Sequence, residues 1–372
     1  MACPGGTIKS NKIIKRTPIP TRMKALLVIG DEEDWEAYAR FKAQLERGVP
    51  EGFRYYTTNY QHILDGKLLD IAEEKIIVLF FFPFEYWNEN IEPPDMKGIY
   101  GNVEFLHKFN HFWELVDNRL SSFYSDKKIY FMNDPKHIAD GRDKELTKRI
   151  LSRQGIRIPT TIDTRDPEEM RELIASEGPF YVKVRYGSMG KGITYLEKGN
   201  WKTNFRFENC QLLNHPKDYG WNFIDVTNDF SFLKQLMALG ENITIEKEID
   251  SFLIDDRKFD LRVYVCFGKV HYIFPRSNDP DAVIMNITQG AIGHNTEFIL
   301  GDLDDQISEI SKMAIASAEA LKLNFTGVDI LIEKGTKNPY ILELNAFPGF
   351  TKPERFNISE AAIYEICSQK WD

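Results

Sequence analysis

Two acidic residues and an asparagine near the C-terminal end of the chain have the types and the spacing of a metal site. Asp329 lies in "GVDILIE", and Glu343 and Asn345 lie in "ILELN", two segments with the composition of strands. Because side chains two positions apart leave the same face of a strand, Glu343 and Asn345 project together. Carboxylate and amide oxygens gathered on one sheet face suit Mg²⁺, whose remaining ligands are phosphates and water. The alternative is an ordinary solvated face, although apolar residues alternate with the acids.

A glycine-rich stretch, "YVKVRYGSMGKGITYLE" at residues 181–197, has the pattern strand, turn, strand. Glycine lets the backbone approach an anion closely, so such a turn can point a row of N–H groups at phosphate oxygens. The stretch is not a Walker A motif, because that motif needs glycine where Arg185 stands and serine or threonine where Gly192 stands. On its own the glycine-rich loop, residues 185–192, is compatible with a phosphate site and with a plain turn.

Arginine residues in two further segments could also contact an anion. "KFDLRVYVCFG" places Asp260 and Arg262 on one face of a strand, and "PRSNDPDAVIMNITQG" supplies Arg276. The planar donors of arginine clamp a phosphate or a developing oxyanion, whereas an isolated Asp-x-Arg pair on a strand is more often a structural ion pair. These residues alone leave both interpretations open.

The elements that must position these residues fall into successive groups along the chain. Residues 1–22, basic and without an apolar core, are predicted to be a flexible arm. Strand-like runs alternate with helical patterns at 32–45 and 102–124, so residues 23–135 are predicted to form an open α/β domain.

The rest of the chain is predicted to form two further parts. Residues 136–248 are expected to be a small lid domain with an insertion at about 198–242. The first part of this insertion, residues 198–219, has no period and is interpreted as an irregular flap that could equally recognise a substrate. From residue 249 to 372 strands dominate, and the short turn at Gly268 predicts an antiparallel return and hence a mixed or antiparallel sheet. The predicted fold class is α/β (α+β).

Composition excludes several classes of function. The 372 residues carry a formal net charge of -9, which argues against a nucleic-acid binder. No apolar run reaches the roughly 20 residues that span a bilayer, so no membrane partner is expected. The 4 cysteines are scattered and form no CxxC pair, which indicates neither a zinc site nor a disulfide framework and favours a cytoplasmic location.

The order of these features resembles the ATP-grasp superfamily, and "FPRS...NITQG" is most similar to the RimK-type carboxylate-amine ligases. The similarity covers residues 125–355 and is strongest at "YVKVRYGSMGKGI", "DLRVYV" and "YILELNAFPGF". It implies an ATP-grasp fold with an N-terminal open α/β domain, a central lid domain and a C-terminal mixed sheet domain. It also implies ATP and one or two Mg²⁺ ions as cofactors, with Mn²⁺ as an alternative ion.

The resemblance also implies roles for individual residues. Lys144 and Lys183 would reach the phosphates, and Glu246, Lys247 and Ile249 would flank the adenine. The full set of residues implied to bind the nucleotide is Lys144, Lys183, Ser188, Met189, Gly190, Lys191, Gly192, Glu246, Lys247, Ile249 and Asp260. Asp260 would lie near the ribose or buttress the site.

The catalytic and metal-binding residues follow from the same resemblance. Arg262 would contact the transferred phosphate, and Arg276 would stabilise an oxyanion. The residues implied to hold the metal are Asp329, Glu343 and Asn345.

The leading hypothesis is an ATP-dependent ligase that forms an amide or peptide bond through an acyl phosphate and releases ADP and phosphate. Its partners would be a small-molecule or peptide carboxylate and an amine, and a homo-oligomer is left open. One rival is a kinase on the same scaffold that phosphorylates a hydroxylated, inositol-phosphate-like substrate. The residues that would form its basic pocket are Arg185, Arg276, Lys352 and Arg355. Another rival is a non-catalytic, ATP-binding regulator.

Overall fold

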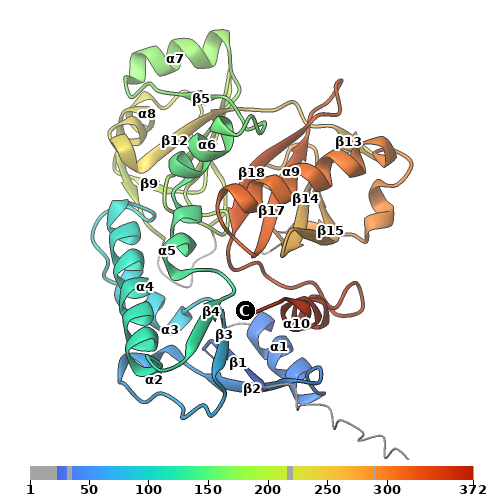
Figure 1. The fold of residues 1–372 in the computed structure, drawn as a ribbon. Helices are drawn as coiled ribbons and strands as arrows, with labels where there is room; N and C mark the ends of the chain where they lie inside the picture. The colour runs from blue at the N-terminus through green and yellow to red at the C-terminus, as the bar shows by residue number, and fades with distance from the viewer. Residues whose placement is uncertain (1–22, 32–35, 216–220, 288–289, 372) are drawn as a thin grey trace, which may run out of the picture.

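The computed structural model describes residues 23–31, 36–215, 221–287 and 290–371. Within these ranges the chain forms three parts, each built on its own sheet (Figure 1). Residues 1–22, predicted to be a flexible arm, lie outside the described residues.

The N-terminal part is a four-stranded parallel sheet in the order β2-β1-β3-β4, which is the predicted open α/β arrangement. Its strands are β1 (Lys24–Ile29), β2 (Phe53–Thr58), β3 (Lys75–Phe80) and β4 (Lys128–Phe131). Its helices are α1 (Glu36–Glu46), α2 (Tyr60–Leu64), α3 (Phe84–Tyr86), the π-helical turn η1 (Trp87–Ile91) and α4 (Val103–Phe123). Helix α4 begins at Asn102, whose side chain accepts the Glu104 N–H, and buries a stripe of aromatic residues at helical spacing.

The central part holds a six-stranded sheet in the order β11-β8-β7-β6-β12-β5. Its strands are β5 (Thr161–Ile162), β6 (Phe180–Val184), β7 (Ile193–Glu197), β8 (Asn200–Thr203), β11 (Ile224–Asp225) and β12 (Ile243–Lys247), with a separate hairpin of β9 (Arg206–Glu208) and β10 (Gln211–Leu213). Its helical segments are α5 (Pro135–Ile138), η2 (Asp140–Arg142), α6 (Lys144–Arg153), α7 (Pro167–Ser176), α8 (Phe230–Met237) and η3 (Gly240–Asn242).

The prediction of an irregular insertion at residues 198–242 is wrong. Strands β8 and β11 extend the central sheet. Helix α8 packs against α7 and against β10 of the separate hairpin. Trp201 and Thr203 are buried on alternate positions of β8, but a strand of 4 residues is too short for that alternation to stand out in the sequence.

The C-terminal part is an antiparallel sheet in the order β16-β15-β14-β17-β18, with β13 paired to β14. Its strands are β13 (Leu253–Ile254), β14 (Arg257–Cys266), β15 (Lys269–Asn278), β16 (Ile292–Gly293), β17 (Phe325–Ile332) and β18 (Pro339–Asn345). The helical segments on it are η5 (Thr296–Ile299), η6 (Asp304–Gln306) and α9 (Ile307–Ala320). The predicted antiparallel turn at Gly268, where φ is 69°, is confirmed.

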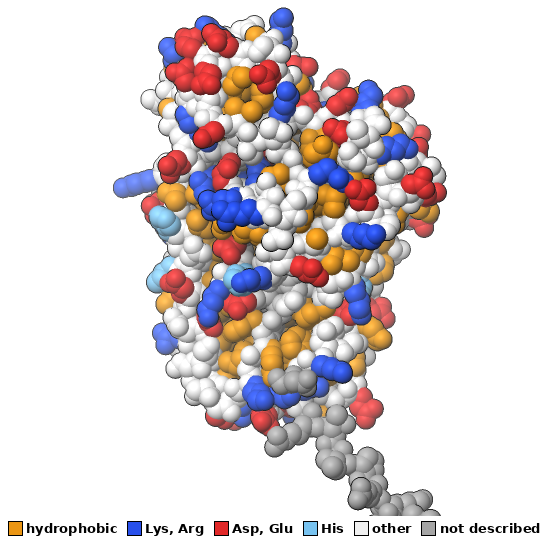
Figure 2. All heavy atoms as spheres, turned by 45° about the horizontal axis from the view of Figure 1, so that its top comes forward, with side chains coloured by type: hydrophobic (Ala, Val, Ile, Leu, Met, Phe, Trp, Pro, Cys, Tyr) orange, Lys and Arg blue, Asp and Glu red, His pale blue; other side chains and the backbone are white. Residues whose placement is uncertain are grey.

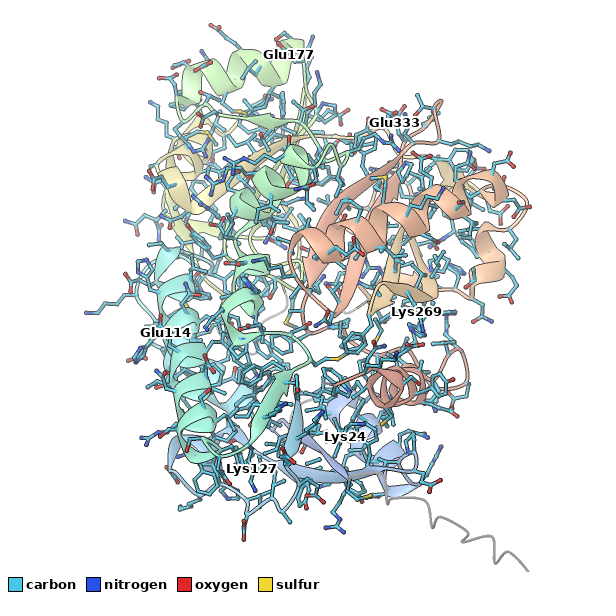
Figure 3. The ribbon with its side chains drawn as sticks, in the orientation of Figure 1. Lys24, Glu114, Lys127, Glu177, Lys269 and Glu333 are labelled. Carbon is cyan, nitrogen blue, oxygen red and sulfur yellow. The ribbon has the colours of Figure 1, made fainter. Side chains whose placement is uncertain are left out.

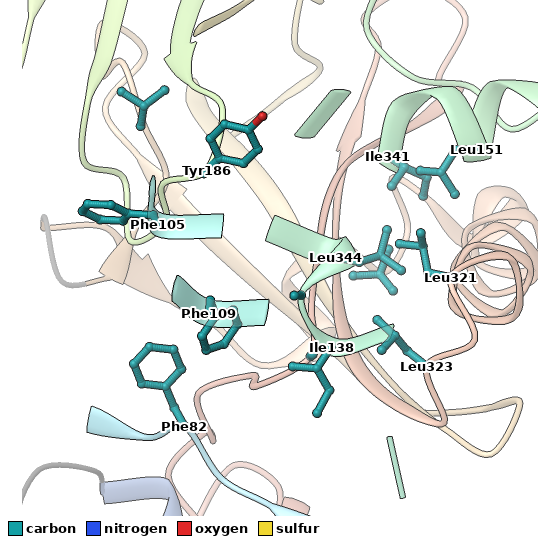
Figure 4. Packing of buried hydrophobic residues seen from close by; sticks show 14 of the residues in the cluster. Phe82, Phe105, Phe109, Ile138, Leu151, Tyr186, Leu321, Leu323, Ile341 and Leu344 are labelled. Atoms are coloured by element: carbon teal, nitrogen blue, oxygen red, sulfur yellow. The ribbon is translucent and has the colours of Figure 1, made fainter. Parts of the chain in front are cut away.

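The last helix, α10 (Ile358–Ser368), returns to the N-terminal part and lies against α1 (Figure 1). Its buried face joins a hydrophobic cluster with β1 and α1, and Tyr264 and Phe325 of the C-terminal sheet belong to the same cluster. A second cluster runs through all three parts, and Figure 4 shows Phe109, Ile138 and Leu344 within it. The apolar core is therefore continuous from one part to the next.

The surface carries charges of both signs. Figure 2 shows acidic side chains gathered at the end of the molecule that carries α7, and Figure 3 places Glu177 at the end of that helix. Within the described ranges, no helix combines the length and the apolar character that crossing a bilayer requires.

Candidate active site

Two hollows meet at the centre of the molecule. The first has a volume of about 170 Å³ and lies between the glycine-rich loop, β12 and the C-terminal sheet, lined among others by Lys183, Glu246 and Ile249. The second has a volume of about 500 Å³ and is lined by all three parts, from Phe82 and Arg142 to Phe347. The residues that line both are Lys144, Gly187, Ser188, Arg262, Arg276, Asn286 and Glu343. Ligands in the two hollows would therefore face each other across these residues.

Lys183 is held at the wall of the first hollow by a buried carboxylate. Glu246 of β12 accepts from Lys183 Nζ at 2.7 Å and from Lys148 Nζ of α6 at 2.7 Å. Burial opposes the charge on Glu246, but the two lysines outweigh it and lower the pKa of this carboxyl from 4.5 to about 2. Glu246 therefore orients Lys183 as a cation and leaves no free carboxylate of its own.

Lys144, the first residue of α6, lies at the border of the two hollows. Its Nζ donates to the carbonyl oxygen of Gly187 at 2.5 Å. Burial lowers the pKa of Lys144 to about 8, although the nearby Glu343 carboxylate acts in the opposite direction. The ammonium group has a carbonyl partner but no ion-pair partner in the described part of the chain, so it can take up an anion.

Arg185 does not belong to either hollow. Its guanidinium forms a two-pronged ion pair with Asp143, at 2.7 and 2.8 Å, and Asp143 also caps the N-terminus of α6. The prediction that Arg185 contributes to the basic pocket of a kinase is therefore wrong. Its charge is neutralised by Asp143, and it lines neither hollow. Lys352 and Arg355 do line the second hollow, where both are exposed.

The predicted arginines and acids form a row of cross-strand pairs on the C-terminal sheet. Asp260 on β14 faces Arg276 on β15, with oxygen–nitrogen distances of 2.7 and 2.6 Å. Arg262 on β14 faces Asp329 on β17, and Arg276 also approaches Asp329 at 3.2 Å. Burial opposes the charge on Asp329, but the two arginines outweigh it and lower its pKa to about 2. Of the two roles left open for Asp260, this geometry fits the buttress.

The three predicted metal ligands lie next to one another. Asp329 faces Glu343 on β18, and the Asn345 amide donates to a Glu343 oxygen at 3.3 Å, so the predicted common face of Glu343 and Asn345 is present. Among the residues that the structure describes, no three His, Cys, Asp or Glu side chains form a complete protein cage for a metal. The Glu343 carboxylate and the Asn345 amide oxygen fit a Mg²⁺ ion that takes its other ligands from phosphates and water, whereas Asp329 beside them also accepts from Arg262 and Arg276.

The glycine-rich loop supplies fewer residues to the first hollow than predicted. Ser188, Gly190 and Lys191 line it, whereas half-exposed Met189 lines only the second hollow. Gly192 lines neither hollow and packs against Val184 with a φ of 68°. Met189 and Gly192 thus do not line the first hollow with the other predicted nucleotide-binding residues.

The loop is fastened to the N-terminal part. Lys191 Nζ lies 2.9 Å from a Glu92 oxygen and 5.0 Å from the centre of the Tyr100 ring. The Tyr100 hydroxyl accepts from the Ser188 N–H at 3.1 Å and donates to the Ser188 carbonyl at 3.2 Å. Glu92 and Tyr100 were missed in the sequence, because nothing in their local pattern indicates a partner about 100 residues away.

Part of the lining of the first hollow is apolar. Ile249, Leu331 and Leu342 line it, together with the linker residues Lys247 and Glu248. A flat aromatic base fits such a slot, with its polar edge against the chain. Lys247 and Ile249 thus line the first hollow together with the predicted phosphate-binding Lys144 and Lys183.

The second hollow is rich in aromatic rings and contains a residue that the sequence did not reveal. Arg142 lies in its wall, beside Phe82 and Phe109. Arg142 directly precedes the "DK" of α6, so its nearness to Lys144 in sequence was the only available signal.

Comparison with known proteins gives a family and a set of relatives. The model of a family described as YheC/D like ATP-grasp matches residues 143–367, more than half of the chain. A protein of Shewanella frigidimarina named "Probable alpha-L-glutamate ligase 2" is 27% identical over 241 residues, which cover 64% of this chain and 67% of that protein. A "Probable alpha-L-glutamate ligase" of Shewanella loihica is 25% identical over 249 residues, with 65% and 68% covered.

Solved structures share the fold at low sequence identity. The macrocyclase MdnC of Microcystis aeruginosa, bound with the precursor peptide MdnA, has a TM-score of 0.55 at 12% identity and covers 92% of this chain and 100% of its own. The D-alanine–D-alanine ligase of Bacillus anthracis has a TM-score of 0.52 at 15% identity, covering 92% and 96%. The ATP-grasp ligase PsnB, in a complex with a precursor variant, Mg and ADP, has a TM-score of 0.53 at 16% identity, covering 93% and 98%. The predicted ATP-grasp fold is confirmed.

Proposed function

Because this chain belongs to the YheC/D-like ATP-grasp family, we propose that it is an ATP-dependent ligase that joins a carboxylate to an amine. The reaction would form an acyl phosphate, which the amine attacks, and it would release ADP and phosphate. The glutamate-ligase names of the relatives support this class of reaction.

One observation carries the proposal: the two hollows share lining residues, among them Glu343, Arg262 and Lys144. A nucleotide whose base lies against Ile249 would direct its phosphates toward this border. A carboxylate in the second hollow could then reach the terminal phosphate from the opposite side, as an in-line displacement requires.

The chain's own residues would act on this geometry as follows. Lys144 and Lys183 would bind the phosphates, Arg262 would offset charge on the transferred phosphoryl group, and Arg276 would stabilise the oxyanion that forms when the amine attacks. Ion pairs with Asp329 and Asp260 hold the two arginines in fixed orientations, so little reorganisation would be needed during the reaction.

Asp329, Glu343 and Asn345 would hold Mg²⁺, which when bound polarises the phosphate oxygens and offsets their charge. We propose that these residues would hold one or two ions, with Mn²⁺ as an alternative to Mg²⁺. The glycine-rich loop would exclude water from the acyl phosphate, which hydrolyses readily.

The proposal also covers the kind of substrate and the cellular location. The carboxylate and the amine would be small molecules or peptides, as the peptide complexes of the structural relatives suggest. The predicted cytoplasmic location agrees with the need for ATP and with the absence of CxxC pairs from the sequence.

The proposed reaction can be tested by trapping the acyl phosphate. The protein is incubated with ATP, Mg²⁺ and a panel of carboxylates, with hydroxylamine as the amine, and both ADP and hydroxamate are measured. We expect hydroxamate in proportion to ADP for at least one acid. ADP formed only with a polyol phosphate, and hydroxamate with none of the acids, would replace the ligase with the kinase. Binding of ATP without formation of ADP, whichever acceptor is added, would identify the regulator.

Replacing one metal ligand tests the metal site. We expect Glu343→Gln to lower the rate of ADP formation by about a hundredfold or more, because an amide holds Mg²⁺ less well than a carboxylate. Glu319→Gln, on the exposed side of α9, serves as the control and should leave the rate unchanged. A Glu343→Gln protein with the wild-type rate, and with wild-type dependence on Mg²⁺ concentration, would remove Glu343 from the metal site.

A further inference from the structure

Arg142 is enclosed by aromatic rings at the wall of the second hollow. Its guanidinium carbon lies 4.1 Å from the centre of the Trp87 ring, 5.0 Å from that of Phe109 and 5.2 Å from that of Phe82. These rings form the aromatic cage, and Figure 4 shows Phe82 and Phe109 within the packed core from which two of its walls are built. The cage fixes the plane and the direction of the guanidinium group.

The hydrogen bonding of Arg142 is far from complete. Its Nη1 donates to the Ser188 hydroxyl at 3.1 Å, and no other hydrogen bond and no ion pair of this side chain is present in the described part of the chain. A guanidinium has five N–H donors, so most of its donor capacity is unused.

The neighbouring cations differ from Arg142 in this respect. Arg262 and Arg276 are paired with acids on the C-terminal sheet, and Arg185 is paired with Asp143. Lys183 and Lys191 are likewise paired, with Glu246 and Glu92. Apart from the exposed rim of the second hollow, Arg142 and Lys144 are the cations of the described site that lack a carboxylate partner. The proposed function assigns Lys144 to the phosphates, which leaves Arg142 for a second anion.

Arg142 is half-buried, so its open donors face the second hollow, where a ligand could accept from them. Burial lowers the pKa of Arg142, and the carboxylates of Glu92 and Glu343 oppose this only from beyond ion-pair distance. The ring faces offset part of the lost hydration, but they accept no in-plane hydrogen bonds from the N–H groups. A carboxylate would accept two of them side by side.

The residues that line the hollow around Arg142 indicate the chemistry of the rest of the ligand. Phe82, Phe84, Phe109, Phe347 and Phe350 contribute to the second hollow, whose volume of about 500 Å³ accommodates a small organic acid. Of the other positive side chains of this hollow, Lys352 and Arg355 are exposed, whereas Arg40, Arg262 and Arg276 are paired with acids. A carboxylate attached to an apolar or aromatic group matches this lining better than a fully polar acid does.

We infer that Arg142 is the binding residue for the carboxylate of an apolar acid in the second hollow. This inference rests on the proposed function and narrows the substrate to acids that bear an apolar or aromatic group. Because Arg142 also donates to Ser188, a bound acid would be in contact with the residue that holds the glycine-rich loop in place. The carboxylate substrate and the loop would then be positioned through one side chain.

The inference can be tested by equilibrium binding without turnover. The probe is N-acetyl-L-phenylalanine, and N-acetyl-L-phenylalaninamide is its neutral match. Binding of each is measured by calorimetry and by tryptophan fluorescence, since Trp87 lies against the guanidinium. In the wild-type protein we expect the acid to bind at least about tenfold more tightly than the amide. This ratio corresponds to the free energy of one hydrogen bond to a charged group, which the amide would lose.

Variants assign that difference to Arg142. Arg142→Gln should weaken binding of the acid at least about tenfold and leave binding of the amide unchanged, while Arg142→Lys, which keeps the charge but not the paired donors, should fall between. ADP–Mg²⁺ affinity and the urea midpoint are measured for each variant as readouts of a phosphate-binding or purely structural role. Arg149→Gln, on the exposed side of α6, is the matched control and should bind both probes as the wild-type protein does.

Several results would overturn the inference. These are equal affinity of the wild-type protein for acid and amide, no saturable binding of the acid, or unchanged acid binding by Arg142→Gln. A loss of ADP–Mg²⁺ affinity in Arg142→Gln, with acid binding retained, would assign Arg142 to the phosphates instead. The acid–amide comparison uses the wild-type protein alone, so it stands even if a variant fails to fold. Hydroxamate formation with other acids would leave the proposed function intact in each of these cases.

Discussion

Lys144 is the residue whose charge state should control nucleotide binding near neutral pH. Its pKa is lowered to about 8 by burial, so in the free protein the ammonium form is lost as pH rises through this value. A bound phosphate favours the ammonium form and raises its pKa. We therefore expect the dissociation constant for ADP–Mg²⁺ to be flat below about pH 7.5 and to rise by up to about tenfold per pH unit above pH 8.

Replacement by arginine provides the comparison for this pH profile. Lys144→Arg keeps its charge across the range, because the guanidinium pKa is above about 12. Its dissociation constant should stay flat where that of the wild-type protein rises. Calorimetry at a series of pH values measures both, and parallel profiles would show that another group is responsible.

Glu246 is the ion-pair partner of two lysines, buried Lys148 and half-buried Lys183. Glu246→Gln would leave Lys148 and Lys183 without their acid, and we expect the free energy of unfolding at neutral pH to fall by about 3 kcal/mol. The pKa of Glu246 is lower in the folded protein, about 2 against 4.5, so its stabilising effect is present above about pH 5 and is lost as pH falls toward 2.

Urea unfolding of both proteins at several pH values measures this effect. The difference in stability between the wild-type protein and Glu246→Gln should shrink on acidification. Glu241→Gln, at an exposed position in η3, should show no comparable loss. A difference that stays constant down to about pH 3 would contradict the assignment of the low pKa to Glu246.

At the scale of elements, the glycine-rich loop is held by contacts that lie outside its own hairpin. The Lys191–Glu92 pair is partly exposed, so removing it should free the loop by only about 0.5–1 kcal/mol. We expect Glu92→Gln to speed amide hydrogen exchange at residues 186–192 by about threefold in the absence of nucleotide.

The neighbouring exposed residue Glu89 provides the control for this experiment. Glu89→Gln should leave exchange in the loop unchanged, because this side chain has no part in the loop contacts. Equal exchange in Glu92→Gln and the wild-type protein would mean that the other contacts of the loop, with Tyr100, Arg142 and Lys144, suffice to fasten it.

At the scale of the whole molecule, α10 joins the end of the chain to its beginning. Ile366 is fully buried, and α10 lies against α1. Ile366→Ala should lower the free energy of unfolding by about 3 kcal/mol, since the removed side chain leaves a cavity in a core shared with β1. Tyr364, 64% exposed on the same helix, should tolerate alanine within about 0.5 kcal/mol. Urea unfolding that shows equal losses for the two variants would contradict a structural role for the buried face of α10.

Much of the molecule could be predicted from local patterns. The parallel N-terminal strands, the β14–β15 hairpin at Gly268 and the common face of Glu343 and Asn345 follow from spacing over a few residues. Short elements could not be predicted in this way. Strand β8 spans 4 residues and β11 spans 2, too few for a period to be detected, so residues 198–242 were misinterpreted as an insertion.

The sequence by itself determined which chemical groups are present, namely the hard oxygen ligands, the lysines and the glycine-rich turn, because each depends on residue type and on near neighbours. The tertiary structure alone decided which charges are already paired. Arg185 is neutralised by Asp143 and Lys191 is fastened by Glu92, whereas Arg142 is left with open donors inside the aromatic cage. These pairings join residues some 40 to 100 positions apart, and the free energy of an ion depends on its surroundings in space rather than on its neighbours along the chain.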